Sequence, residues 1–259
     1  MKACQILAID IGNTRASCAC FVGRRLMSTA HVPTEGLRSV SVADVRRIWK
    51  QLGPKDAGPD AVVLASVVPR VSAGLRKAIK AWCGSGPLEL GRNLTVPLKV
   101  NYRPSSSVGP DRLAAALAAV AKLGAPVIVL DFGTALTIDV VNAQGVYDGG
   151  LIVPGIELSL DSLYKYTALL PAVKVKAPAG VLGHSTEASL LSGAIRGLGY
   201  VCDGAVAEIR LSLGKKTPVL GTGGRASLMR RYTRCLDQVD PHLTLRGLEI
   251  AFRSRDRSL

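Results

Sequence analysis

The sequence of 259 residues has few aromatic side chains, since phenylalanine, tryptophan and tyrosine together make up 4% of it. Apolar residues nevertheless account for 48%, so we expect a core built mainly from leucine, valine, isoleucine and alanine. This apolar content excludes a largely disordered chain. The length allows either one large domain or two modest ones.

Long apolar runs are also missing. No run reaches the roughly 18 residues that a membrane-spanning helix needs, so we predict no membrane partner. The N-terminus carries Lys2 but leads directly into a strand-like stretch, without the separate apolar region of a signal peptide. We therefore predict a cytoplasmic protein.

Metal and disulfide patterns are absent as well. The three histidines, His31, His184 and His242, are scattered and make no metal-binding motif. Six cysteines are present, but none of them form a Cys-x-x-Cys pair, so we predict buried, reduced thiols.

Acidic residues are scarce relative to basic ones. There are 19 aspartates and glutamates against 33 lysines and arginines, and the formal charge is +14. Such a surface attracts anions, which include nucleotides, acidic metabolites and nucleic acids. Because no nucleic-acid-binding signature accompanies the charge, we expect a generally basic surface and no nucleic-acid partner.

The common nucleotide-binding motifs are missing too, since neither the Gly-x-Gly-x-x-Gly motif nor the P-loop motif occurs. What the chain does contain is one pattern twice. An apolar stretch ends at Asp10 and is followed by Gly12 and Thr14; a second ends at Asp131 and is followed by Gly133 and Thr134. The two copies, at Asp10 and Asp131, lie too far apart to be units of a short repeat. They indicate a domain duplication, so we expect two similar lobes.

The rest of the chain alternates short strands with helices. We predict lobes at residues 1–123 and 124–259, with the closing helix as a candidate to pack back on the first lobe. Glycines in the long helix over 186–213 suggest close approach of another backbone. Predicted strands are 6–10, 15–22, 26–32, 61–66, 88–90, 96–100, 127–130, 135–141, 146–147, 151–153 and 218–221. Predicted helices are 41–52, 71–83, 111–123, 156 to about 169, 186–213, 225–231 and 245–253.

The two aspartate turns are the first candidate site. A glycine turn can bring backbone N–H groups close to a phosphate, and Thr14 or Thr134 adds a hydroxyl donor. A carboxylate beside phosphates requires a cation or its bound waters, so Asp10 and Asp131 both imply a metal ion. The alternative is that these aspartates only cap turns. The duplication favours the functional interpretation.

A second candidate site is the sequence Gly109-Pro110-Asp111-Arg112, which opens a predicted helix. Asp111 is either a simple helix cap, or it accepts a proton from a hydroxyl nucleophile while Arg112 holds an anionic group. Proline is favourable at a helix start, so we expect Pro110 to leave this turn intact.

Together these motifs resemble the type III pantothenate kinases, of the acetate kinase, sugar kinase, Hsp70 and actin superfamily. The resemblance implies an α/β fold of two ribonuclease-H-like, actin-like ATPase lobes, with mixed sheets flanked by helices and a cleft between the lobes. The matching motifs are DIGNT (10–14), SVVP (66–69), GPDR (109–112), DFGTALTID (131–139), GGLIVPG (149–155), TALLP (167–171), Ser185-Thr186 with the SGAIRGLGY helix, GTGG (221–224) and LTLRGLEI (243–250).

The implied reaction is transfer of the γ-phosphate of ATP to the 4′-hydroxyl of pantothenate, the first step of coenzyme A synthesis. The resemblance makes Asp111 the catalytic base and implies Mg²⁺ with ATP, a monovalent cation (K⁺ or NH₄⁺) and a homodimer with its acceptor site at the interface. It also assigns Asp131 to the monovalent cation, while Asp10 would bind Mg²⁺ directly or through water. The implied pantothenate contacts are Tyr102, Gly109, Pro110, Asp111, Arg112 and Thr186. The implied ATP contacts are Asp10, Ile11, Gly12, Asn13, Thr14, Arg15, Ala16, Ser17, Thr134, Gly223 and Gly224.

Two other functions stay open at this point. The basic surface favours a Baf-type transcriptional accessory protein with little kinase activity, but such a binder needs neither a base nor a cation site. A phosphohydrolase of the same superfamily, such as a polyphosphate hydrolase, would lack the acceptor pair Asp111 and Arg112.

Overall fold

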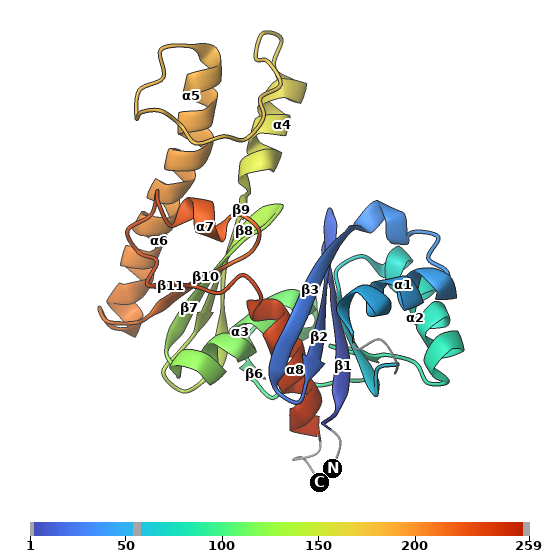
Figure 1. Ribbon diagram of the computed structural model, residues 1–259. Helices are drawn as coiled ribbons and strands as arrows, with labels where there is room; N and C mark the ends of the chain where they lie inside the picture. Colours follow the sequence, from blue (N-terminus) through green and yellow to red (C-terminus); the bar gives the residue numbers. More distant parts are fainter. Residues whose placement is uncertain (1–2, 54–57, 256–259) are drawn as a thin grey trace. The chain divides into compact units, whose positions relative to one another are not determined.

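The computed structural model describes residues 3–53 and 58–255. It divides into two compact units, Met1–Ala118 with Leu243–Leu259 and Ala119–His242 (Figure 1). Within the described ranges, no helix is long and apolar enough to cross a membrane. The boundaries between the two expected lobes stay a prediction.

The first unit is built on a mixed sheet with the strand order β3-β2-β1-β4-β5. Strand β1 lies in the middle, antiparallel to β2 and parallel to β4. The strands are β1 (Gln5–Ile11), β2 (Arg15–Val22), β3 (Arg25–Pro33), β4 (Ala61–Ser66) and β5 (Leu88–Glu89). The short β6 (Lys99–Val100), which follows in the chain, is not a strand of this sheet.

Alternate side chains of β1 point into two different apolar clusters. Leu7 and Ile9 pack with helices α1 (Val42–Leu52) and α2 (Pro69–Cys83). Ile6 and Ala8 pack with α8 (Leu243–Ser254) and the start of α3 (Pro110–Leu123). The sheet is therefore covered on both faces, as Figure 1 shows for α1, α2 and α8.

Local sequence signals explain where these helices begin and end. Ser41 and Asp44 form a capping box at the start of α1. Helix α2 begins with Pro69 and ends at Gly84, which has a positive φ of 76°. Gly124, with φ of 79°, ends α3 as predicted.

The second unit repeats the sheet of the first. Its strands follow one another in the order β9-β8-β7-β10-β11, with β7 antiparallel to β8 and parallel to β10. This order and these directions match β3-β2-β1-β4-β5, so the predicted duplication into two similar mixed α/β lobes is confirmed. The strands are β7 (Val127–Phe132), β8 (Ala135–Val141), β9 (Val146–Pro154), β10 (Val219–Thr222) and β11 (Gln238–Val239).

One face of this sheet buries Ile128, Leu130 and Ile138 against the helices of the unit. In Figure 1, α4 and α5 extend past the ends of β8 and β9. The helices are α4 (Ile156–Tyr166), α5 (Thr186–Ser192), α6 (Leu198–Leu213) and α7 (Ala226–Met229).

The predicted helix over 186–213 is continuous but not uniform. A π-helical turn, Gly193–Gly197, joins α5 to α6. Of the glycines that we expected to admit another backbone, Gly199 does so, because a Cβ there would lie 2.1 Å from the Tyr232 carbonyl oxygen. The expectation is wrong for Gly193, Gly197 and Gly204, because a Cβ on any of them would meet no other segment within 4 Å.

The structure also differs from the predictions in one strand and contains short elements that were not predicted. Strand β9 runs without the predicted interruption at residues 148–150, because a register shift beside Val140 absorbs the positive φ of Gly149. The two-residue β11 was not predicted. The 3₁₀ turns η1 (Thr34–Leu37) and η2 (Ser105–Ser107) were also missed, since such short segments carry no periodic pattern.

Candidate active site

The hairpin between β1 and β2 carries the first group of predicted ATP contacts. Asp10 lies opposite Ser17 on β2 and beside Ala65 on β4. At the tip of the hairpin, Asn13, Thr14 and Arg15 are exposed. The central strand therefore carries a carboxylate at its next-to-last residue, and the polar loop begins two residues later.

Hydrogen bonds within this hairpin decide which groups remain available. The Gly12 N–H donates to the Arg15 carbonyl at 3.1 Å, and in the second unit the Gly133 N–H donates to the Ala135 carbonyl at 3.1 Å. The N–H groups of both glycines thus close their own turns. A phosphate at either turn would have to contact the residues of the tip.

Thr34 braces the first hairpin from outside. Its hydroxyl donates to the Gly12 carbonyl at 2.7 Å, and its N–H donates to the Thr14 carbonyl at 3.1 Å. Thr34 is 3% exposed, so this support is buried. No local pattern predicts this support, because Thr34 follows the end of β3, far from the hairpin in the sequence.

The surroundings of Asp10 are partly apolar. Its Oδ1 atom is buried. Burial raises the pKa of the neighbouring Cys18 thiol to about 12, and the charge of Asp10 adds to this shift. None of the six cysteines, all of which lie among the described residues, forms a disulfide. Cys18, Cys20, Cys202 and Cys235 are buried, whereas Cys4 and Cys83 are only half-buried.

The predicted acceptor site opens α3. Pro110 is the first residue of the helix, as expected, and the Leu113 N–H donates to the Gly109 carbonyl at 3.2 Å. Asp111 Oδ1 accepts the Arg112 N–H at 2.9 Å. A Cβ at position 109 would lie 2.4 Å from that same oxygen, so a larger residue there would displace the Asp111 carboxylate. Asp111 thus has a local structural role, which does not exclude a chemical one.

Two further predicted acceptor residues lie in the first unit. Arg112 is buried, with 8% of its surface exposed. Burial of a guanidinium is costly without compensating polar groups, so this position is unusual for an arginine. Tyr102 is half-buried in the loop before η2.

In the second unit, Asp131 occupies the position that Asp10 has in the first. It lies opposite Thr137 on β8 and beside Thr222 on β10. The Gly223 turn approaches the carboxylate very closely, because a Cβ on Gly223 would lie 2.3 Å from Asp131 Oδ1 and 2.7 Å from the Phe132 carbonyl oxygen. Gly223 also has a φ of 88°, which favours glycine.

Two other segments converge on the same hairpin. The Gly155 N–H donates to the Thr134 carbonyl at 3.0 Å, and the Arg225 N–H donates to the Phe132 carbonyl at 3.1 Å. The Arg225 side chain pairs with Glu157 on α4, with an Nε–Oε1 distance of 2.6 Å. Gly155, Glu157 and Arg225 were not predicted as site residues.

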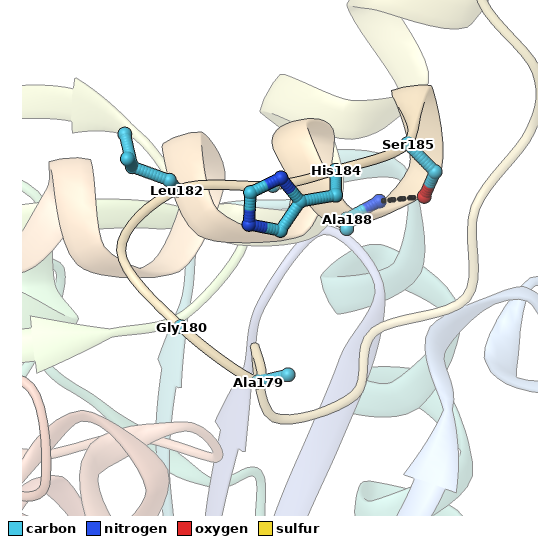
Figure 2. Close-up of a pocket in the computed structure, with 7 residues that line it drawn as sticks. Ala179, Gly180, Leu182, His184, Ser185 and Ala188 are labelled. Carbon is cyan, nitrogen blue, oxygen red and sulfur yellow. Dashed lines mark hydrogen bonds between the residues drawn. The ribbon is translucent and has the colours of Figure 1, made fainter.

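Thr186 belongs to a different part of the second unit. It is the exposed first residue of α5, directly after Ser185, whose hydroxyl accepts the Ala188 N–H at 3.2 Å. A pocket of about 290 Å³ lies before this helix. Figure 2 shows His184 and Leu182 on the loop that lines it. Its lining is mostly small and apolar residues.

The structure therefore places the predicted residues in three groups. Asp131, Thr134, Gly223 and Gly224 belong to adjoining turns of the second unit, and Thr186 opens α5. The remaining residues, at 10–17, 102 and 109–112, belong to the first unit.

Comparison with known proteins decides the family. The family described as type III pantothenate kinase matches residues 6–208. The chain belongs to this family. A type III pantothenate kinase of Myxococcus xanthus is 35% identical over 250 residues, which cover 96% of this chain and 98% of the relative. One of Sphingopyxis alaskensis is 36% identical and covers 94% and 96%.

Solved structures show the fold of the family at greater distance. A Campylobacter jejuni protein described as a Baf family transcriptional activator has a TM-score of 0.62 at 18% identity, covering 97% of this chain and 99% of that one. A glucokinase of the ROK family from Streptomyces griseus, in complex with glucose and AMPPNP, has a TM-score of 0.52 at 13% identity, covering 96% and 99%. These likenesses confirm the predicted actin-like α/β fold.

The family membership establishes the reaction class. The protein is a pantothenate kinase, a phosphotransferase of coenzyme A biosynthesis that uses ATP and pantothenate as substrates. As an ATP-dependent kinase, it uses the nucleotide together with a divalent metal ion. The Baf-type alternative is not favoured, because the likeness to the Campylobacter jejuni protein, at 18% identity, shows a shared fold alone.

Proposed function

We propose that Asp111 is the base of this kinase and accepts the proton of the pantothenate 4′-hydroxyl as its oxygen bonds to the γ-phosphorus of ATP. The bond from that phosphorus to the β,γ-bridging oxygen breaks, and ADP leaves. Asp111 Oδ1 accepts the Arg112 N–H at 2.9 Å, which holds the carboxylate at the start of α3. Arg112 and Tyr102 would hold the pantothenate carboxylate and chain.

For the nucleotide, we propose that the ATP phosphates bind at the tips of the two equivalent hairpins. The first provides residues 10–17, and the second provides Thr134 together with Gly223 and Gly224. The supporting observation is the duplication itself: both units have an aspartate as the next-to-last residue of their central strand, and both close the following turn through a glycine N–H. This repeated arrangement is the observation that carries the proposal.

The aspartates fit the metal ions that the family implies. Among the described residues, no group of three or more histidine, cysteine or acidic side chains could hold a metal ion. Mg²⁺ in phosphotransferases is typically held by one or two carboxylates together with phosphates and water, so Asp10 alone suffices from the protein. Bound there, Mg²⁺ would neutralise charge on the phosphates.

Asp131 suits a monovalent cation, K⁺ or NH₄⁺. Its carboxylate and the Phe132 carbonyl oxygen lie so close to the Gly223 turn that a Cβ on Gly223 would clash with both. Carboxylate and carbonyl oxygens are the donors that hard cations prefer. Because Gly223 has no side chain, the turn can approach these oxygens closely.

Replacing Asp10 with asparagine should weaken binding of a Mg²⁺-loaded, non-hydrolysable ATP analogue by about tenfold or more, because a charge-assisted contact is lost. Binding of the metal-free analogue should change little. Titration calorimetry of both forms gives the answer. Glu208→Gln, an exposed carboxylate on α6, is the control. Equal losses with and without Mg²⁺ would contradict a metal role for Asp10.

We also propose that the kinase is a homodimer through the second unit, with its acceptor site completed at the interface near Thr186. Large apolar side chains of this unit are exposed, among them Tyr166 at 86%, Leu169 at 91% and Leu182 at 77%. Such a group is typical of protein interfaces.

Sedimentation should therefore give twice the chain mass of 27.1 kDa. Leu169→Glu should shift the population to monomer and raise the KM for pantothenate. Met27→Glu, on β3 of the first unit, should leave the dimer intact. A monomeric wild-type protein with normal activity would refute this assembly.

The excess charge is unevenly distributed between the units. The first contains 21 basic and 9 acidic residues, and the second contains 12 and 10. Almost the whole charge of +14 therefore belongs to the first unit. We keep the prediction that this unit has a basic surface without a nucleic-acid partner, which a salt-dependent DNA-binding titration would overturn.

A further inference from the structure

A buried polar group of three residues lies beside the Asp131 turn and has no part in the mechanism so far. Tyr147 on β9 is fully buried and donates its hydroxyl hydrogen to Asp139 Oδ1 at 2.6 Å. Thr137 donates its own to Asp139 Oδ2 at 2.8 Å. Asp139 is 1% exposed, so the bond from Tyr147 is buried, whereas the bond from the half-buried Thr137 is only partly so.

The direction of the Thr137 bond has a chemical consequence. A threonine hydroxyl has one hydrogen and two lone pairs, and an ionised carboxylate can only accept. Because Asp139 takes the single hydrogen of Thr137, the hydroxyl has only lone pairs to offer elsewhere. It can accept a hydrogen bond or bind a cation, but it cannot donate a second bond.

Strand register places Thr137 beside the candidate cation site. Thr137 pairs directly with Asp131 across β7 and β8. Directly opposed residues of an antiparallel pair project from the same face of the sheet, with Cβ atoms about 4.5–5.5 Å apart. Two oxygen atoms without a hydrogen between them repel each other unless a cation lies between them.

We propose that Thr137 Oγ1 is a further ligand of the monovalent cation at Asp131, and that Asp139 and Tyr147 are positioning residues that hold its lone pairs toward that cation. The proposal rests on the cation site assigned above to Asp131. Outer carboxylates orient the ligands of many metal sites in this way.

The first unit offers an internal comparison. There Ser17 lies opposite Asp10 and contacts His31 Nδ1 at 3.2 Å. A histidine ring nitrogen can donate or accept, so it does not fix the direction of the serine hydroxyl. In the second unit, Asp139 does fix the direction of the Thr137 hydroxyl. This difference agrees with separate ions at the two aspartates.

Potassium-dependent thermal stabilisation tests this proposal without relying on turnover. The melting temperature is followed against KCl at constant ionic strength, with the Mg²⁺-loaded ATP analogue present. Thr137→Val should need about tenfold more K⁺ for half-maximal stabilisation, because it keeps the shape and loses the oxygen. Thr137→Ser, which keeps the hydroxyl, should stay within about twofold of the wild type. Asp139→Asn should raise the K⁺ requirement although Thr137 is intact, and Tyr147→Phe is the milder variant if that protein fails to fold.

The variants test the cation site at Asp131 and the role of Thr137 separately. If Asp131→Asn abolishes the K⁺ effect while Thr137→Val keeps it within twofold of the wild type, the cation site stands and the role of Thr137 is refuted. If Asp131→Asn keeps the K⁺ effect, or the wild type shows none, the cation site itself is wrong and the proposal falls with it.

Discussion

Replacing Asp111 with asparagine is expected to lower kcat by roughly 10²-fold or more, while ATP binding stays unchanged. The amide cannot take the proton from the pantothenate hydroxyl. It can still accept the Arg112 N–H, which Asp111 Oδ1 accepts at 2.9 Å, so the start of α3 should persist. Steady-state kinetics gives kcat, and titration with an ATP analogue gives the affinity.

Asp44→Asn is the matched control for this substitution. Asp44 is also a carboxylate in the first turn of a helix, where it belongs to the capping box of α1. Its replacement should cost a fraction of the stability of α1 and leave kcat unaltered. If Asp111→Asn retained kcat within about threefold, Asp111 would be a helix cap and the base would have to be sought elsewhere.

Gly223→Ala is expected to damage both stability and activity. An alanine at a φ of 88° is strained, and its Cβ would lie 2.3 Å from Asp131 Oδ1 and 2.7 Å from the Phe132 carbonyl oxygen. We expect a loss of roughly 1–3 kcal/mol in the free energy of unfolding. Displacement of the Asp131 carboxylate should lower kcat/KM roughly 10²-fold. Chemical denaturation and steady-state kinetics measure the two effects.

Gly145→Ala separates backbone strain from the crowding of the site. Gly145 has a φ of 71° at the tip of the β8–β9 hairpin, and nothing lies within 4 Å of its would-be Cβ. Its replacement should cost about 1 kcal/mol from strain alone and leave kcat/KM unaltered. Equal losses of activity in both variants would show that the approach of Gly223 to Asp131 does not matter.

The sequence alone could predict the elements that depend on local signals. The strand limits at Arg15–Val22 and Ala61–Ser66 follow from apolar alternation and its breaks. Proline at position 110 and glycine at position 124 mark the two ends of α3. The repeat of aspartate, glycine and threonine predicted two similar lobes, and the matching strand orders confirm it.

Contacts between distant residues could not be predicted in this way. The bond from Thr34 to Gly12 joins residues 22 positions apart, and the pair of Arg225 with Glu157 joins residues 68 apart. The approach of Gly223 to Asp131 depends on β10 lying beside β7. None of these three contacts has a periodic pattern in the sequence. The order of the strands that brings such residues together is decided by packing of the whole unit.

Glycine content was a misleading signal in the long helix over 186–213. Gly199 contacts another backbone, but Gly193, Gly197 and Gly204 have open space around them. Composition alone cannot distinguish a glycine that is required for packing from one that is tolerated on a surface. The distinction needs the position of the neighbouring segment, here the Tyr232 carbonyl.

The most direct test of the account is the identity of the reaction product. Purified protein is incubated with ATP, Mg²⁺ and pantothenate in K⁺ buffer and in a buffer whose only monovalent cation is a large organic one. Mass spectrometry then follows pantothenate and ADP. We predict 4′-phosphopantothenate and ADP in equal amounts, formed much faster with K⁺. Release of ADP without phosphorylated pantothenate, or equal rates in the two buffers, would contradict the account.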